Sequence, residues 1–140
     1  MTRWILQILV AITTFTVGLA LAPKPITFSG DYQMSGFRER YFSSDGEALL
    51  FHGGEFDSPS KARLALREET IGKRIIEWTS SLDANGRKIG ERVLFVSGAA
   101  PETDVELYWT KGAAFCWVMA PSVKHAELFE RSKAWTDRCH

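Results

Sequence analysis

Residues 4–22 form an apolar segment that separates the start of this chain from the rest. Fourteen of its 19 residues are apolar and none is charged, whereas Arg3 comes just before it and Lys24 soon after it. As a helix, 19 residues extend roughly 28 Å, close to the thickness of the hydrocarbon core of a bilayer. A surface helix of a soluble domain would carry a polar face. The segment therefore predicts a signal peptide or membrane anchor at residues 1–22.

The sequence leaves open whether this segment is removed. Ala20-Leu21-Ala22 has the small-x-small pattern of a cleavage site, but Pro23 follows it directly and disfavours a cut there; a cut after Ala20 is the alternative. The apolar run is long for a signal peptide, which favours the anchor. Because positive charge precedes the segment, we expect a cytoplasmic N-terminus. The domain then lies outside the cytoplasm, either as part of a single-pass membrane protein or as a secreted or periplasmic protein.

Length and charge narrow the function classes. The chain has 140 residues and equal numbers of basic and acidic side chains, 17 of each. That length suits one domain and is too short for a TIM barrel or a full dinucleotide-binding fold. The balanced charge argues against nucleic acid as a partner, since nucleic-acid binders normally carry a basic excess. We divide the chain into residues 1–22, an irregular linker and first strand at 23–46, and an α+β domain at 47–140.

Turn and capping signals divide this domain into strands and helices. Asp57-Ser58-Pro59 is typical of a helix start and Gly72 of a helix end. Asp83-Ala84-Asn85-Gly86 is typical of a hairpin turn. Residues 113–120 are apolar on both faces, which predicts a central strand covered on both sides. The expected strands are 47–56, 74–82, 88–97, 104–110 and 113–120, and the expected helices are 59–71 and 123–135.

Short turns join most of these strands. They favour an α+β fold, with an antiparallel sheet of about five strands and both helices packed on one face. A half-open barrel wrapped around a helix is the alternative.

Two cysteines, Cys116 and Cys139, are compatible with a disulfide outside the cytoplasm. Such a bond would join the end of the last helix to the sheet and stabilise the fold by about 3 kcal/mol in the chain-entropy model. The alternative is one core thiol and one thiol near the C-terminus. Cys139 and His140 are too few ligands for a metal site, so no metal and no cofactor are expected.

Histidine offers the only catalytic lead. His52-Gly53-Gly54 is similar to the glycine-rich oxyanion segment of some esterases, but the chain has no G-x-S-x-G motif. A strand histidine beside a β-bulge is the simpler interpretation. His125, in the first turn of the last helix, is expected to be exposed. No catalytic residue is assigned.

Aromatic residues are the other lead. Trp78, Trp109 and Trp117 fall on three strands that could be adjacent. They form either the core under the helices or, together with His52, an exposed binding surface.

Residues 50–66, LFHGGEFDSPSKARLAL, resemble the opening of SPOR peptidoglycan-binding domains, in which a strand and a polar turn lead into a helix. The resemblance covers 17 residues and implies a peptidoglycan- or glycan-binding module. SPOR domains continue as strand, strand, helix and strand, whereas four strands are expected here before the next helix. No family is assigned.

These observations lead to one hypothesis with three alternatives. The leading hypothesis is a non-enzymatic, membrane-tethered or secreted domain that binds a ligand or a partner of the membrane or cell envelope. The first alternative is a small hydrolase-like enzyme outside the cytoplasm that uses His52 with a carboxylate. The second is the glycan-binding module, and the third is an anchor subunit whose residues 4–22 pack on partner helices.

Overall fold

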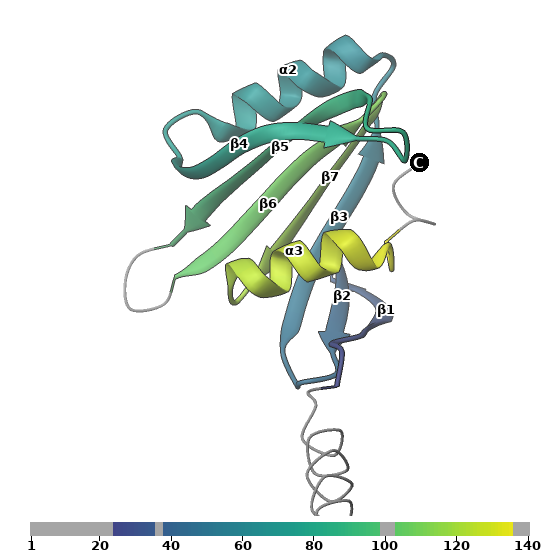
Figure 1. Ribbon diagram of the computed structural model, residues 1–140. Helices are drawn as coiled ribbons and strands as arrows, with labels where there is room; N and C mark the ends of the chain where they lie inside the picture. The colour runs from purple at the N-terminus through teal and green to yellow at the C-terminus, as the bar shows by residue number, and fades with distance from the viewer. Residues whose placement is uncertain (1–23, 36–37, 99–102, 136–140) are drawn as a thin grey trace, which may run out of the picture.

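A computed structural model describes residues 24–35, 38–98 and 103–135 (Figure 1). Its elements follow in the order β1 (Phe28–Ser35), β2 (Arg38–Ser43), β3 (Ala48–Glu55), α2 (Pro59–Thr70), β4 (Arg74–Leu82), β5 (Lys88–Ser97), β6 (Asp104–Lys111), β7 (Ala114–Ala120) and α3 (Val123–Ser132). Within this part of the chain, no helix is both long and apolar enough to cross a membrane. Residues 1–22, on which the anchor and signal-peptide predictions fall, lie outside it.

The seven strands form one antiparallel sheet in the order β1-β2-β3-β7-β6-β5-β4. The α+β class is confirmed, and β7 takes the central position expected for residues 113–120. The expected number of about five strands was too low, because residues 23–46 contribute β1 and β2 to the same sheet. In β2, Tyr41 and Ser43 are buried while Arg40 and Phe42 are exposed. The charged and glycine residues around these positions mask that alternation in the sequence.

The helices begin where the sequence predicts. Ser58 caps α2, and its Oγ accepts a hydrogen bond from the backbone N–H of Lys61 at 3.2 Å. Pro59 occupies the first turn, where a missing N–H leaves no bond unmade. Ser122 caps α3 in the same way, with His125 N–H as the donor.

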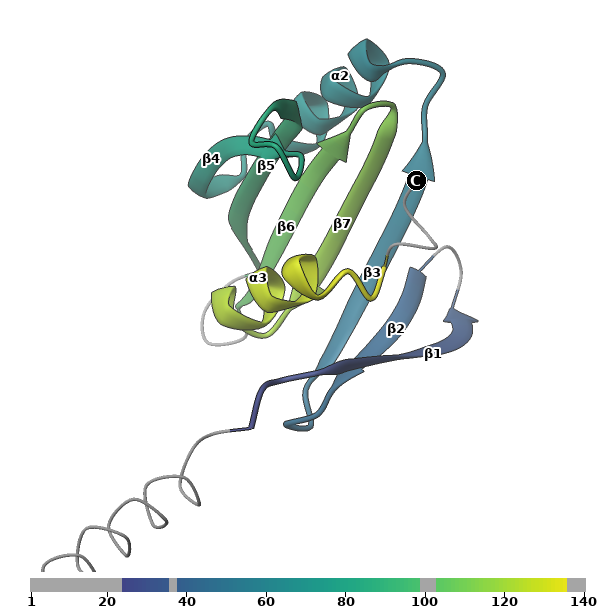
Figure 2. The same ribbon diagram turned by 45° about the vertical axis from the view of Figure 1, so that its right-hand side comes forward.

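The two helices cover opposite faces of the sheet (Figures 1 and 2), so the expectation that both pack on one face was wrong. Side chains alternate along β6, so that Leu107 and Trp109 lie in the cluster under α3 and Tyr108 lies in the cluster with Leu66 of α2. Residues 105–110 and 114–118 are all buried. Two central strands buried on both faces need cover on both faces, which one helix layer cannot provide.

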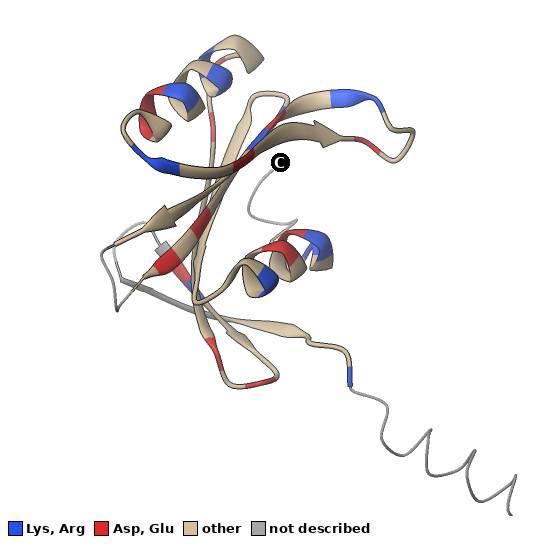
Figure 3. Ribbon diagram, turned by 60° about the vertical axis from the view of Figure 1, so that its left-hand side comes forward, with Lys and Arg blue, Asp and Glu red and all other residues tan. Residues whose placement is uncertain are grey.

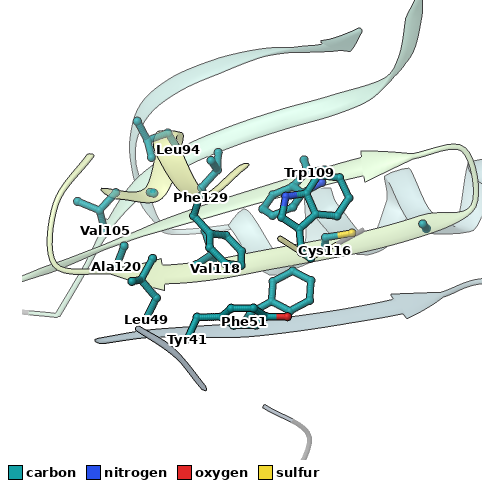
Figure 4. Close-up of a cluster of buried hydrophobic side chains, with 14 residues drawn as sticks. Tyr41, Leu49, Phe51, Leu94, Val105, Trp109, Cys116, Val118, Ala120 and Phe129 are labelled. Carbon is teal, nitrogen blue, oxygen red and sulfur yellow. The ribbon is translucent and has the colours of Figure 1, made fainter. Parts of the chain in front are cut away.

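The core on the α3 side is rich in aromatic rings (Figure 4). Phe129 of α3 lies at its centre, with ring centroids 4.9 Å from Tyr41, 5.6 Å from Phe51 and 5.4 Å from Phe28. The last helix is thereby packed against strands from the start of the domain. The smaller cluster on the other face consists of Leu66, Val93, Phe95, Tyr108, Phe115 and Trp117.

Candidate functional site

Two adjoining hollows lie where the β4–β5 turn approaches the ends of β6 and α3. We call the first the aromatic cleft. It measures about 450 Å³ and is lined by Ser80, Ser81, Leu82, Asp83, Ala84, Ile89, Trp109, Lys111, Glu130, Arg131, Lys133 and Trp135. We call the second the basic hollow. It measures about 590 Å³ and is lined by Pro59, Arg63, Asp83, Lys88, Ile89, Gly90, Lys111 and Gly112. Both volumes are in the usual range for small-molecule sites.

Two tryptophans form a wall of the aromatic cleft. The rings of Trp109 and Trp135 meet edge to face, with centroids 5.2 Å apart. Trp135 Nε1 donates a hydrogen bond to the backbone carbonyl of Glu130 at 3.0 Å. Trp109 is only 2% exposed, and its Nε1 has no hydrogen-bond partner among the described residues. A buried donor without an acceptor costs about 1–3 kcal/mol.

A charged network holds α3 against the β4–β5 hairpin beside the cleft. Arg92 Nε lies 2.7 Å from one oxygen of Glu130 and 3.0 Å from the other, and its other nitrogens contact Glu77 and Glu127. Burial opposes the charge on Arg92, yet Glu130, Glu77 and Glu127 outweigh it and raise the pKa of the guanidinium. Burial raises the pKa of Glu130 above its usual range, although Arg92 opposes this shift. Figure 3 shows acidic and basic positions on α3 and on the hairpin.

The four predicted binding residues are spread over the sheet. His52 and Trp117 are register partners on β3 and β7, and their ring centroids are 6.2 Å apart. Trp109 lies on the opposite face, in the core under α3. Trp78 is 45% exposed on β4, an edge strand. The structure thus brings His52 together with Trp117 and places only Trp109 in the cleft.

The cleft also uses residues that the sequence did not single out. Lys111 falls between the expected strands 104–110 and 113–120, and Trp135 is the last residue of the expected helix 123–135. One feature of the sequence could have indicated part of the cleft. Trp109 lies on an expected strand and Lys111 follows two residues later, and alternate strand residues lie on the same face of the sheet. Their meeting with Trp135, 24 residues beyond Lys111, depends on how α3 packs.

A serine, a histidine and an aspartate also meet at the start of α3. His125 Nδ1 lies 2.7 Å from Ser122 Oγ, and its Nε2 lies 2.8 Å from Asp45 Oδ2. The Ser43 hydroxyl, followed by His125, holds the pKa of the Asp45 carboxyl below its usual range. The His125 side chain is 12% exposed, so the expected exposure was wrong, because Asp45 approaches it from the β2–β3 turn. Ser122 Oγ also accepts the His125 backbone N–H, so Ser122 is the N-cap of α3, and none of the three residues lines either hollow.

The predicted Cys116–Cys139 bond remains a prediction. Cys116 is fully buried and is not a free thiol. Cys139 lies outside the described residues. No group of three or more metal-ligating side chains occurs in the described part of the chain.

Comparison of the chain with models of protein families, with curated proteins and with solved structures finds no match.

Proposed function

We propose that this chain is a non-enzymatic binding domain whose ligand occupies the aromatic cleft. The observation that carries the proposal is the buried, unpartnered indole N–H of Trp109 in the wall of an open cleft. A ligand that supplies an acceptor satisfies that donor, while Ile89, Leu82 and Trp135 offer apolar contact. The His52 hydrolase alternative is not carried further, because His52 lines neither hollow and its ring lies against Trp117.

Phenol, a neutral ring with an acceptor oxygen, tests the site. The full ¹⁵N-labelled chain in detergent micelles contains five tryptophans, and the signal absent from Trp109→Phe identifies the Trp109 indole N–H. We expect phenol to shift that signal saturably, in the millimolar range usual for so small a ligand. Trp117 is the matched internal control, because it lies on the other face. A shift at Trp109 no larger than at Trp117 would contradict the proposal.

A second function, assembly with a partner strand, is favoured by the exposed edge of the sheet. Eight large hydrophobic side chains are exposed among the described residues, and Ile75, Ile76, Trp78 and Leu82 all lie on β4. This nine-residue strand pairs only with β5, so its outer backbone groups lack strand partners in the described sheet. Long apolar edges are normally blocked by charged side chains, proline or bulges. β4 has no lysine or proline, but it carries Arg74 and Glu77 and a register shift between Ile75 and Glu77. We therefore propose that β4 also adds an extended strand of a protein partner.

Self-association provides the first measurement on this edge. We expect sedimentation of the full chain in detergent to show dimers or larger species whose population falls in Trp78→Lys, because a charge on the edge opposes strand pairing. Leu64→Lys is the matched control, since Leu64 is an exposed apolar residue of α2 and not of β4. If the two variants sediment alike, β4 does not pair with a second copy.

We also propose that the domain works outside the cytoplasm, either tethered by residues 4–22 or released from them. The support is the uncharged apolar segment that follows Arg3. The measurement is the intact mass of the protein from membrane and soluble fractions, after alkylation with and without reductant. A full-length mass in the membrane indicates an anchor, and a mass lacking about twenty residues indicates secretion. A full-length mass confined to the cytosol would be evidence against both the anchor and secretion.

Absence of alkylation without reductant would support the Cys116–Cys139 bond.

A further inference from the structure

We infer that the ligand of the aromatic cleft is a small anion, with a phosphate or carboxylate group on an apolar ring-sized body. This inference rests on the proposed binding function of the same cleft and adds the chemical class of the ligand. It depends on three features: the charges around the cleft, the position of Lys111, and the apolar wall.

Basic side chains gather around the two hollows, although the chain as a whole has no net charge. The acidic lining residues are both paired with arginine. Asp83 lies 3.1 Å from Arg87, and Glu130 lies 2.7 Å from Arg92. The basic lining residues are Arg63, Lys88, Lys111, Arg131 and Lys133.

Three of these basic residues are not neutralised by a described carboxylate. Arg63, Lys88 and Lys111 make no ion pair in the described part of the chain. Of these three, only Lys111 lines the aromatic cleft, where its positive charge attracts an anionic group.

Lys111 lines both hollows and lies two residues after Trp109 on β6. Alternate residues of a strand share a face, so the Cα atoms of these two residues are about 7 Å apart on one side of the sheet. An anionic group at Lys111 therefore leaves room for a ring-sized body between the lysine and the indole N–H. The face of an aromatic ring placed there accepts the indole N–H as a weak hydrogen bond. A ligand of this size can contact both residues at once.

The wall that faces such a body is apolar. Leu82, Ala84 and Ile89 come from the β4–β5 hairpin, and Trp135 comes from the segment after α3. A ring placed between these elements would be removed from water on both sides. A cleft of about 450 Å³ holds a small molecule of this kind. The combination of an apolar wall, one buried donor and Lys111 at the rim is the chemistry that recognises a phosphate monoester or a carboxylate with an aromatic or aliphatic body.

Three ligands separate the contribution of the anionic group from that of the ring: phenyl phosphate, phenol and inorganic phosphate. All three are titrated into the full ¹⁵N-labelled chain in zwitterionic detergent at low salt, with the Trp109 indole N–H as the readout. We expect half-saturation by phenyl phosphate at about a fivefold lower concentration than by phenol, which corresponds to about 1 kcal/mol for one exposed charge. We expect inorganic phosphate to leave the Trp109 signal in place, because it lacks a ring that could extend from Lys111 to the indole.

Lys111→Gln tests the assigned cation, and Lys61→Gln is the matched control on the exposed face of α2. In Lys111→Gln, phenyl phosphate and phenol should reach half-saturation at the same concentration. In Lys61→Gln, phenyl phosphate should still reach it at about a fivefold lower concentration than phenol. Equal half-saturation by phenol and phenyl phosphate in the wild-type chain would overturn the anionic ligand while leaving the binding domain intact. Failure of phenol to shift Trp109 would instead count against the proposed function itself. Retention of the phenyl phosphate advantage in Lys111→Gln would also overturn the inference.

Discussion

Replacing Phe129 by alanine lowers the free energy of unfolding by about 4 kcal/mol. Phe129 is fully buried, and its ring contacts the rings of Phe28, Tyr41 and Phe51. Alanine removes the aromatic surface and leaves a cavity that three rigid rings from three strands cannot easily fill. The measurement is chemical denaturation of the full chain, with and without the substitution, under the same detergent conditions.

Phe42→Ala is the matched control for this prediction. The Phe42 side chain lies on β2 but is 38% exposed, so the same substitution should cost less than about 1 kcal/mol. Since Phe129 lies in α3, its loss should also loosen the helix that carries part of the cleft. Equal destabilisation by the two substitutions would mean that the aromatic cluster under α3 is not the main core.

Gly90→Ala is expected to destabilise the fold by about 3 kcal/mol. A Cβ at Gly90 would lie 1.9 Å from the backbone oxygen of Thr110 and 2.5 Å from its carbonyl carbon. Backbone atoms cannot rotate away, so β5 would have to move from β6. That movement would also break the hydrogen bond from Glu91 N–H to Thr110 Oγ1, which measures 3.0 Å.

Gly54→Ala separates this steric effect from the general effect of a glycine in a strand. A Cβ at Gly54 meets nothing within 4 Å, and its φ is not in the left-handed region. We therefore expect Gly54→Ala to be neutral or to stabilise by up to about 1 kcal/mol, through the reduced entropy of the unfolded chain. Thermal unfolding of both variants would check the pair. A Gly90 variant as stable as the wild type would contradict the close approach of β5 and β6. Because Gly90 lines the basic hollow next to the cleft, the same variant should weaken phenol binding at Trp109.

Local chemistry made the elements of this fold predictable. Ser58-Pro59 and Gly72 define α2 through contacts within a few residues, and the Asp83–Gly86 turn defines the β4–β5 hairpin. The position of β7 was also predictable, because a strand with apolar residues on both faces must be central. β1 and β2 were harder to identify, since β2 buries Tyr41 and Ser43 on one side only and charged and glycine residues surround these positions.

The cleft was much less predictable. Trp109 was noted as an aromatic residue on a strand, but nothing in its neighbourhood indicated a buried indole N–H without a partner. The contact of Trp109 with Trp135 depends on the packing of α3 across β6 and β7. Likewise, the glycine at position 90 has a role only because β6 approaches it closely in space.

The sequence by itself determined where both described helices begin, where five of the seven strands lie, which strand is central, and that residues 4–22 are apolar and uncharged. These properties arise from caps, turns and periodicity, which act over a few residues. Only the tertiary structure decided that the helices cover opposite faces, that β4 is an exposed edge, and that Trp109, Lys111 and Trp135 share a cleft. Those features depend on strand order and helix packing between residues far apart in the chain, and no local pattern encodes such contacts.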